Sequence, residues 1–236
     1  MIRPDGKTVR RLRKLAWRLH RPAWVERHGL WLPVRHPAIA PEVARQIYLG
    51  DYESREFEIV RDRLEPSDVV LELGAGIGFL SAWCAKRIGS ARVTAYEADP
   101  ALVPILKETY ARNRVSPTLV NAMLGPGAGT RPFHRQERFF ASSAHRAGGE
   151  AIAVRQEDRD EVLARLRPSF LVVDIEGGEA ELLRNASLGT VRKICLETHP
   201  DVLSDEALSA LCAELFAQGF RLDFTRLRKN VFYFWR

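Results

Sequence analysis

With 236 residues, 46% of them hydrophobic and 28% charged, the chain has the size and composition of one globular domain. It contains no apolar run of the ~18–20 residues that a membrane span needs, no apolar segment typical of a secretory signal, and no Cys or His spacing that indicates zinc. The net charge of +6 is concentrated in residues 1–28, where nine Lys or Arg face two acids, which argues against a nucleic-acid groove across the domain.

The N-terminal region is predicted to be a basic arm. Residues 7–20 have the pattern of an amphipathic helix that ends at Pro22. We interpret residues 1–60 as a basic N-terminal helical extension and residues 61–236 as the main domain. The arm either packs on the domain or meets an anionic membrane surface. Three free cysteines suit a reducing compartment, so we expect a cytoplasmic protein, peripheral to the inner face of the membrane if the arm binds lipid.

Strands and helices alternate along the rest of the chain. A short edge strand is expected at 29–34, and helices from Pro41 and over 53–64. Further strands are predicted at 68–73, 92–96, 119–122, 138–140, 152–154, 170–174 and 191–197. Helices are predicted over 78–88, 100–113, 159–166 and 204–218, and another helix follows the block that ends at Glu179 and runs through Leu182 and Leu183. A loop is expected over 141–149, and an antiparallel pair at 220–224 and 231–235. This order predicts an α/β fold, a doubly wound Rossmann-like sheet that is mostly parallel with an antiparallel strand near the C-terminal end.

The stretch from Asp68 to Gly78 is the most informative motif, because a buried strand runs into three glycines at spacing two. Glycines let the backbone turn sharply and approach a ligand, and the next helix start offers free N–H groups. Phe79 stands where a dinucleotide fingerprint needs Gly or Ala, which disfavours an NAD oxidoreductase. Glu72, two residues before Gly74, fits a ligand with positive charge. The pattern resembles motif I of class I S-adenosylmethionine-dependent methyltransferases.

Polar residues follow the predicted strands, at the edge where ligands bind in such sheets. Glu97, at the end of the second strand, is expected to accept both ribose hydroxyls of the methyl donor. Asn121 either bonds the adenine or is a turn residue. The residues predicted to bind the donor, S-adenosylmethionine, are Glu72, Gly74, Ala75, Gly76, Gly78, Glu97, Ala98, Asn121 and Asp174.

A second resemblance involves residues 174–179, Asp-Ile-Glu-Gly-Gly-Glu, which are similar to the Asp-x-Glu-Gly-x-Glu signature of FkbM-type methyltransferases. Segments at Tyr52-Glu53, 96–100 and 197–200 also resemble that family, so the likeness covers about residues 45–235. It implies O-methylation of a sugar, glycan or secondary metabolite, with no nucleic acid as partner and with Tyr52 and Glu53 near the substrate. The alternatives are an N-methyltransferase, one acting on a protein or nucleic acid, and a nonenzymatic binding protein of the same fold.

The predicted catalytic residues are His199, Asp174, Glu197 and Glu176. His199 would accept the proton of the acceptor hydroxyl. Glu197 lies two residues before it, so on an extended backbone both side chains point to one side and the carboxylate can hold the imidazolium. Asp174 and Glu176 would grip the acceptor or the ammonium group of the donor. An alternative that we do not favour has Asp174, Glu197 and His199 hold Mg²⁺.

Overall fold

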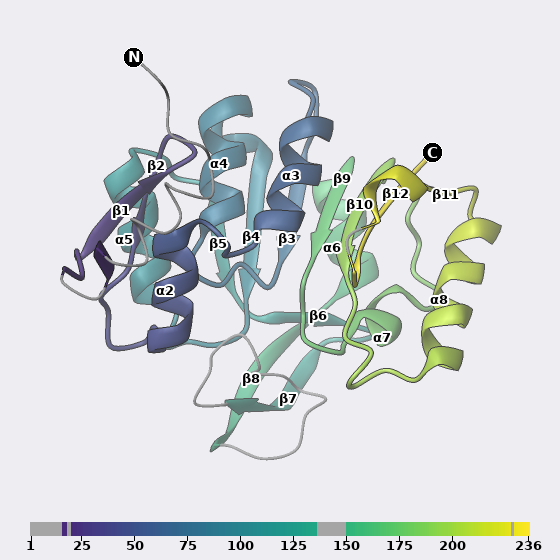
Figure 1. Ribbon diagram of the computed structural model, residues 1–236. Coiled ribbons are helices and arrows are strands. Elements are labelled where there is room, and N and C mark those ends of the chain that lie inside the picture. Colours follow the sequence, from purple (N-terminus) through teal and green to yellow (C-terminus); the bar gives the residue numbers. More distant parts are fainter. Residues whose placement is uncertain (1–15, 18–19, 136–149, 228) are drawn as a thin grey trace.

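The computed structural model describes residues 16–17, 20–135, 150–227 and 229–236, and its centre is a seven-stranded sheet with the order β11-β12-β10-β9-β3-β4-β5 (Figure 1). Five strands are parallel: β3 (Val70–Leu73), β4 (Val93–Glu97), β5 (Thr118–Asn121), β9 (Phe170–Val173) and β10 (Lys193–Glu197). The antiparallel strand β12 (Val231–Trp235) pairs with β10 and with the two-residue β11 (Arg221–Leu222). The predicted fold class is confirmed.

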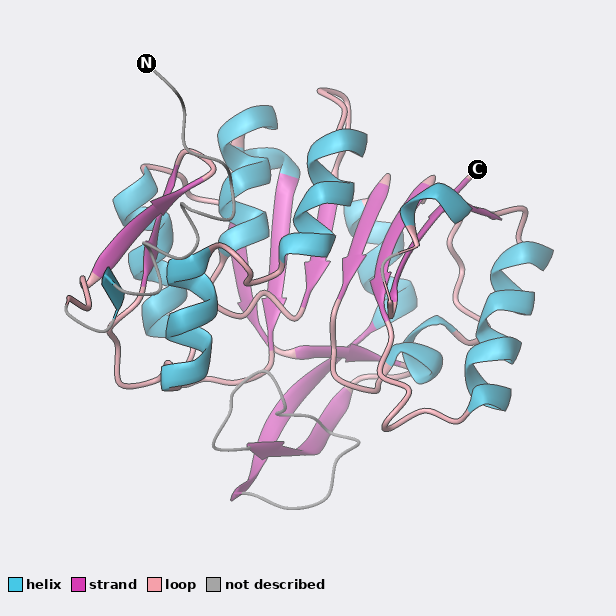
Figure 2. Ribbon diagram, in the orientation of Figure 1, coloured by secondary structure: helices cyan, strands magenta, loops and turns pink. Residues whose placement is uncertain are grey.

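Helices cover both faces of this sheet (Figure 2). One core is formed with α2 (Pro41–Leu49), α3 (Ser54–Arg63), α4 (Phe79–Ile88) and α5 (Val103–Asn113). The other core is formed with α6 (Arg159–Leu166), α7 (Glu179–Leu183) and α8 (Asp205–Ala217). Successive strand residues alternate between the two cores, as Phe170 and Leu171 do. Burial on both faces explains why β3, β9 and β10 are mostly apolar in sequence.

The segment before the sheet packs into the first core. The predicted edge strand is β2 (Leu30–Pro33), which pairs with β1 (Trp24–Arg27) in a separate hairpin and not with the main sheet. The amide of Asn113 fixes this hairpin on α5, because it accepts the N–H of Trp31 and donates to its carbonyl. The boundary predicted at residue 60 falls inside α3. The predicted helix over 7–20 lies mostly outside the described residues.

A second small sheet lies below the carboxyl ends of the main strands in Figure 1, with the order β6-β8-β7. Its strands are β6 (Met123–Gly125), β7 (Gly129–Arg135) and β8 (Glu150–Asp158). The sequence predicted a piece of β8 but not β6 or β7. The strand piece at 138–140 and the loop at 141–149 lie outside the described residues. No described helix is long and apolar enough to cross a membrane.

Candidate active site

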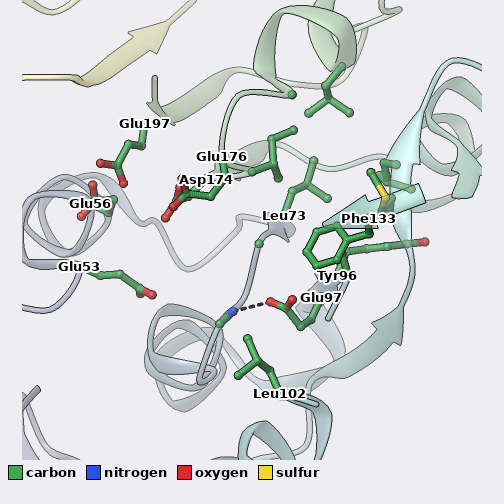
Figure 3. Close-up of a pocket in the computed structure, with 18 of the residues that line it drawn as sticks. Glu53, Glu56, Leu73, Tyr96, Glu97, Leu102, Phe133, Asp174, Glu176 and Glu197 are labelled. Atoms are coloured by element: carbon green, nitrogen blue, oxygen red, sulfur yellow. Dashed lines mark hydrogen bonds between the residues drawn. The ribbon is translucent and has the colours of Figure 1, made fainter. Parts of the chain in front are cut away.

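A cavity of about 690 Å³ opens at the carboxyl ends of the parallel strands, where ligands bind in such sheets (Figure 3). Figure 3 shows two different ends of this cavity. At one end Glu97 lies with Tyr96, Leu102 and Phe133, whereas the opposite end is rich in carboxylates. We call the carboxylate-rich end the acid end, and its residues are Glu53, Glu56, Asp174, Glu176 and Glu197.

The glycine turn after β3 has the conformation that the motif predicts, since Gly74, Gly76 and Gly78 have φ values of 85°, 55° and 79°. A Cβ atom on Gly74 would lie 1.7 Å from the carbonyl oxygen of Asp174, so the turn and the end of β9 are in close contact. Gly74 and Gly76 line the cavity, but Gly78 and Ala75 do not. Instead, Gly78 faces the helix α5, where a Cβ atom would meet side chains at 2.9 and 3.0 Å.

Glu97 closes the turn from the next strand. Its carboxylate accepts the N–H of Gly76 at 2.7 Å and the N–H of Asp99 at 2.8 Å. The side chain is buried yet lines the cavity, and burial raises the pKa of Glu97 to about 7 although these backbone bonds oppose the shift. Each carboxylate oxygen has a further lone pair, so Glu97 can also accept a ribose hydroxyl. The neighbouring apolar side chains suit the flat face of adenine.

Besides Ala75 and Gly78, two more of the residues predicted to bind the donor, Glu72 and Asn121, do not line the cavity. Glu72 points to the α4 side of the sheet, because it shares a strand face with Val70 and not with Leu73. Burial raises the pKa of Glu72 to about 8, and its partner Ser81 on α4 partly opposes that shift. Asn121 is the last residue of β5 and donates from its amide to the carbonyls of Glu97 and Ala98, so it ties the end of β5 to β4. Ala98 itself does line the cavity.

At the acid end, the segment before α3 supplies Tyr52 and Glu53, as the sequence predicts. The two side chains share a hydrogen bond, while burial and the charge of Glu72 raise the pKa of Glu53 well above its ordinary value. Glu56 lies one turn further along α3. Burial raises the pKa of Glu56 to about 7, and the charge of Glu197 contributes to this shift. A carboxyl group that keeps its proton near neutral pH can donate as well as accept a hydrogen bond.

Asp174 and Glu197 come from the ends of β9 and β10 and face the cavity. Burial and the charges of Glu197 and Glu176 raise the pKa of Asp174 well above its ordinary value. Its Oδ1 atom is enclosed and has no hydrogen-bond partner among the described residues. Glu197 is held from the other side by Asn230, whose amide donates to Oε1 at 2.8 Å.

His199 lies behind this layer and does not line the cavity. Its Nδ1 atom is 2.7 Å from Oε1 of Glu179, and Nε2 is 3.3 Å from Glu176 and 3.6 Å from Asp174. Burial would lower the pKa of His199, but the hydrogen bond to Glu179 and the charge of Glu176 outweigh it and raise the pKa. The predicted role of His199 as direct base therefore does not match its position, and its hydrogen-bonded partner is Glu179 instead of Glu197.

No role was predicted from the sequence for four residues at the site, which are Glu56, Arg131, Phe133 and Glu179. Glu56 lies three positions after Glu53, a spacing that puts both on one side of a helix, and Glu179 is the last acid of the block that begins at Asp174. Both could have been found from these spacings. Arg131, which pairs with Glu181, and Phe133 reach the cavity from β7, a strand that the sequence did not predict.

The proteins that resemble this chain in sequence match the segment that carries the glycine turn and Glu97. The family model for ribosomal RNA adenine dimethylase matches residues 46–122, about a third of the chain. "Ribosomal RNA small subunit methyltransferase A" of Thermotoga neapolitana and of Thermotoga maritima are both 42% identical over 67 residues, which is 28% of this chain. The chain spans only about a quarter of the length of these curated relatives, 25% and 23% respectively. The matched segment holds Tyr52, the glycine turn and Glu97.

Solved structures resemble the chain more weakly. A methyltransferase from Pyrococcus furiosus is 15% identical, covers 98% of both chains and has a TM-score of 0.49. Precorrin-6y C5,15-methyltransferase from Geobacter metallireducens is 18% identical, covers 77% of this chain and 85% of its own, and has a TM-score of 0.44. The fold class is therefore established by the strand order and not by these scores.

Over residues 46–122 these comparisons support the coarser prediction, a class I S-adenosylmethionine-dependent methyltransferase, and they correct the finer one. They do not show the FkbM family. The predicted acceptor, a hydroxyl of a sugar, glycan or secondary metabolite, is contradicted, because the matching relatives are named as rRNA methyltransferases. The prediction of a small-molecule or glycan partner and no nucleic acid is wrong for the same reason.

Proposed function

We propose that the chain transfers a methyl group from S-adenosylmethionine to a nitrogen atom of an RNA base. The observation that carries this proposal is the match of residues 46–122 to rRNA methyltransferases, since this segment supplies the glycine turn and Glu97. The segment ends before Asp174, so the comparison supports the donor side directly. The acceptor side is argued from its chemistry. The resemblance of residues 174–179 to the FkbM-type signature lies outside the matched segment and remains a prediction from the sequence.

The acid end suits an acceptor that presents N–H groups. Carboxylate oxygens accept hydrogen bonds from an amine, and charge-assisted bonds of this kind are stronger than neutral ones. Asp174 and Glu197 face the cavity from two neighbouring strands, so together they can orient an exocyclic amine toward the donor. Their charge would also repel a phosphate, which leaves the RNA backbone outside the cavity. The nine Lys or Arg of residues 1–28 are suited to bind that backbone.

Methyl transfer needs the acceptor atom aligned with the bond that breaks at the sulfonium. Holding both reactants in this geometry can supply about 7–11 kcal/mol of the barrier. In the proposed arrangement Glu97 holds the ribose, the apolar side chains Leu102 and Phe133 enclose the adenine, and the methionine part extends past Gly74 toward the acid end. The acceptor amine then lies between the methyl group and Asp174, which can take up its proton.

The proposal is tested by incubating the purified chain with labelled S-adenosylmethionine and protein-free small-subunit rRNA. We expect label in the RNA, and mass spectrometry of the digested RNA should find it on a base nitrogen. RNA of unrelated sequence and a mixture of glycans serve as controls. Tight binding of the demethylated product, S-adenosylhomocysteine, without label in any RNA would retain the donor site and reject the RNA acceptor.

Glu97→Gln should weaken binding of S-adenosylhomocysteine by about 10- to 150-fold at pH 8, because losing a charged acceptor costs about 1.5–3 kcal/mol. Since the pKa of Glu97 is raised to about 7, its carboxylate gains a proton as the pH falls through 7. Parent affinity should therefore fall between pH 8 and pH 6, whereas the affinity of the variant should stay flat. Calorimetric titration measures both.

The matched control is Glu157→Gln, which alters a carboxylate that bonds Tyr96 but does not line the cavity. Its affinity should follow the parent at each pH. If Glu97→Gln also followed the parent, the ribose would not be held by Glu97.

A further inference from the structure

Three side chains of metal-ligating type converge at the inner side of the acid end, where Asp174 and Glu197 line the cavity and His199 lies behind them. Asp174, Glu197 and His199 each offer one ligand atom, and these atoms lie within 4.8 Å of one another. Two ligands on opposite sides of an ion, with bonds of about 2.1–2.4 Å, lie about 4.2–4.8 Å apart. The three residues follow the ends of the neighbouring strands β9 and β10, so rigid elements hold them. The cluster therefore has the size of a coordination sphere.

The same cluster has buried oxygens that lack partners. Oδ1 of Asp174 and Oε2 of Glu179 are both enclosed without a hydrogen-bond partner among the described residues, and the side chain of Glu179 is 0% exposed. The carboxyl groups of Glu53, Glu56, Glu176 and Glu197 line the same cavity as Asp174. Burying unpaired negative charge is costly. The cluster therefore has the charge and the open oxygens that a cation would satisfy.

The hydrogen-bond partners of the His199 ring also support a cation site. Metal-ligating histidines commonly donate from one ring nitrogen to a carboxylate, which leaves the other nitrogen free for the ion. Here Nδ1 lies 2.7 Å from the buried Glu179, while Nε2 faces Glu176 at 3.3 Å and Asp174 at 3.6 Å. Ionised carboxylates only accept hydrogen bonds. The point between Nε2 and these oxygens therefore requires a proton or a cation.

We propose that Asp174, Glu197 and His199 bind one divalent cation at the acid end of the cavity, with Glu179 as the residue that positions the imidazole. One nitrogen and two oxygens suit Mn²⁺ or Zn²⁺ better than Mg²⁺ or Ca²⁺, which prefer oxygen alone. The sequence did not favour a metal because it could not show that the three ligand atoms meet. The site goes beyond the proposed function and does not depend on which acceptor the chain methylates.

The test measures Mn²⁺ binding to the chelator-treated, full-length chain, without donor or RNA, by electron paramagnetic resonance and calorimetry. We expect one Mn²⁺ per chain. Asp174→Asn and Glu197→Gln should each weaken it by at least about tenfold, because each replaces a charged ligand by an amide of the same size. Glu179→Gln should weaken it by about 10- to 100-fold, as loss of a residue that orients a ligand does.

Glu181→Gln is the matched control, since it removes a carboxylate of the same cavity that pairs with Arg131 and is not in the cluster. It should bind Mn²⁺ as the parent does. The proposal is overturned if the parent binds no Mn²⁺ at millimolar concentration, or if Glu181→Gln weakens binding as much as Asp174→Asn. Binding of S-adenosylhomocysteine by each variant shows that it is folded, and an RNA result of either sign leaves this outcome unchanged.

Discussion

Gly74→Ala is expected to lower the affinity for S-adenosylhomocysteine by about 100-fold or more while leaving the chain folded. Gly74 has φ 85°, a conformation that costs a residue with a Cβ atom about 1–3 kcal/mol. The added Cβ would also lie 1.7 Å from the carbonyl oxygen of Asp174, where no atom can remain. The turn must therefore move away from β9. A loss of about 100-fold in affinity corresponds to about 2.8 kcal/mol, which the strain and the clash together can account for.

The control for this experiment separates backbone strain from the clash. Gly219 has φ 87°, almost the same as Gly74, but a Cβ atom there would meet nothing within 4 Å. Gly219→Ala should lower the free energy of unfolding by a similar strain term and leave donor affinity unchanged. Calorimetric titration and denaturant unfolding of both variants measure the two effects. Equal affinity in Gly74→Ala and the parent would show that the turn does not position the donor.

The central strands β3, β9 and β10 were predictable because nearly all of their residues are buried and most are apolar. The residues that end these strands, such as Glu97 and Asp174, could be placed at the cavity for the same reason, since parallel strands end at one edge of the sheet. The predicted starts of the helices were less accurate. Helix α5 begins at Val103 and not at Pro100, because the carboxylate of Asp99 accepts the N–H of Ala101 in a turn before it.

The directions of side chains were harder to predict than their positions in the chain. Glu72 follows the rule that strand residues alternate, but the sequence does not say which face of β3 borders the cavity. His199 lies beyond the last residue of β10, so alternation with Glu197 did not determine its partner. That partner, Glu179, comes from the start of α7, and only the packing of the helix against the strand brings the two together.

Asp174→Asn is expected to lower the rate of methyl transfer to RNA by about 10²–10⁴-fold, the usual value of a positioned base. Affinity for S-adenosylhomocysteine should change little, because the amide has the size of the carboxylate and because, in the proposed arrangement, the glycine turn and Glu97 hold most of the donor. Single-turnover rates with saturating donor, measured on the RNA that accepts label, give the effect. A variant that retained most of the parent rate would leave orientation of the two reactants as the source of catalysis.

His199 provides the internal check on that interpretation. It does not line the cavity but lies 3.6 Å from Asp174 and 3.3 Å from Glu176, so we expect it to act by positioning these carboxylates. His199→Gln should then lower the rate in the parent and have little further effect in Asp174→Asn, because residues that act as a unit are not additive. Full additivity of the two substitutions would contradict this coupling and show that His199 contributes to the rate independently of Asp174.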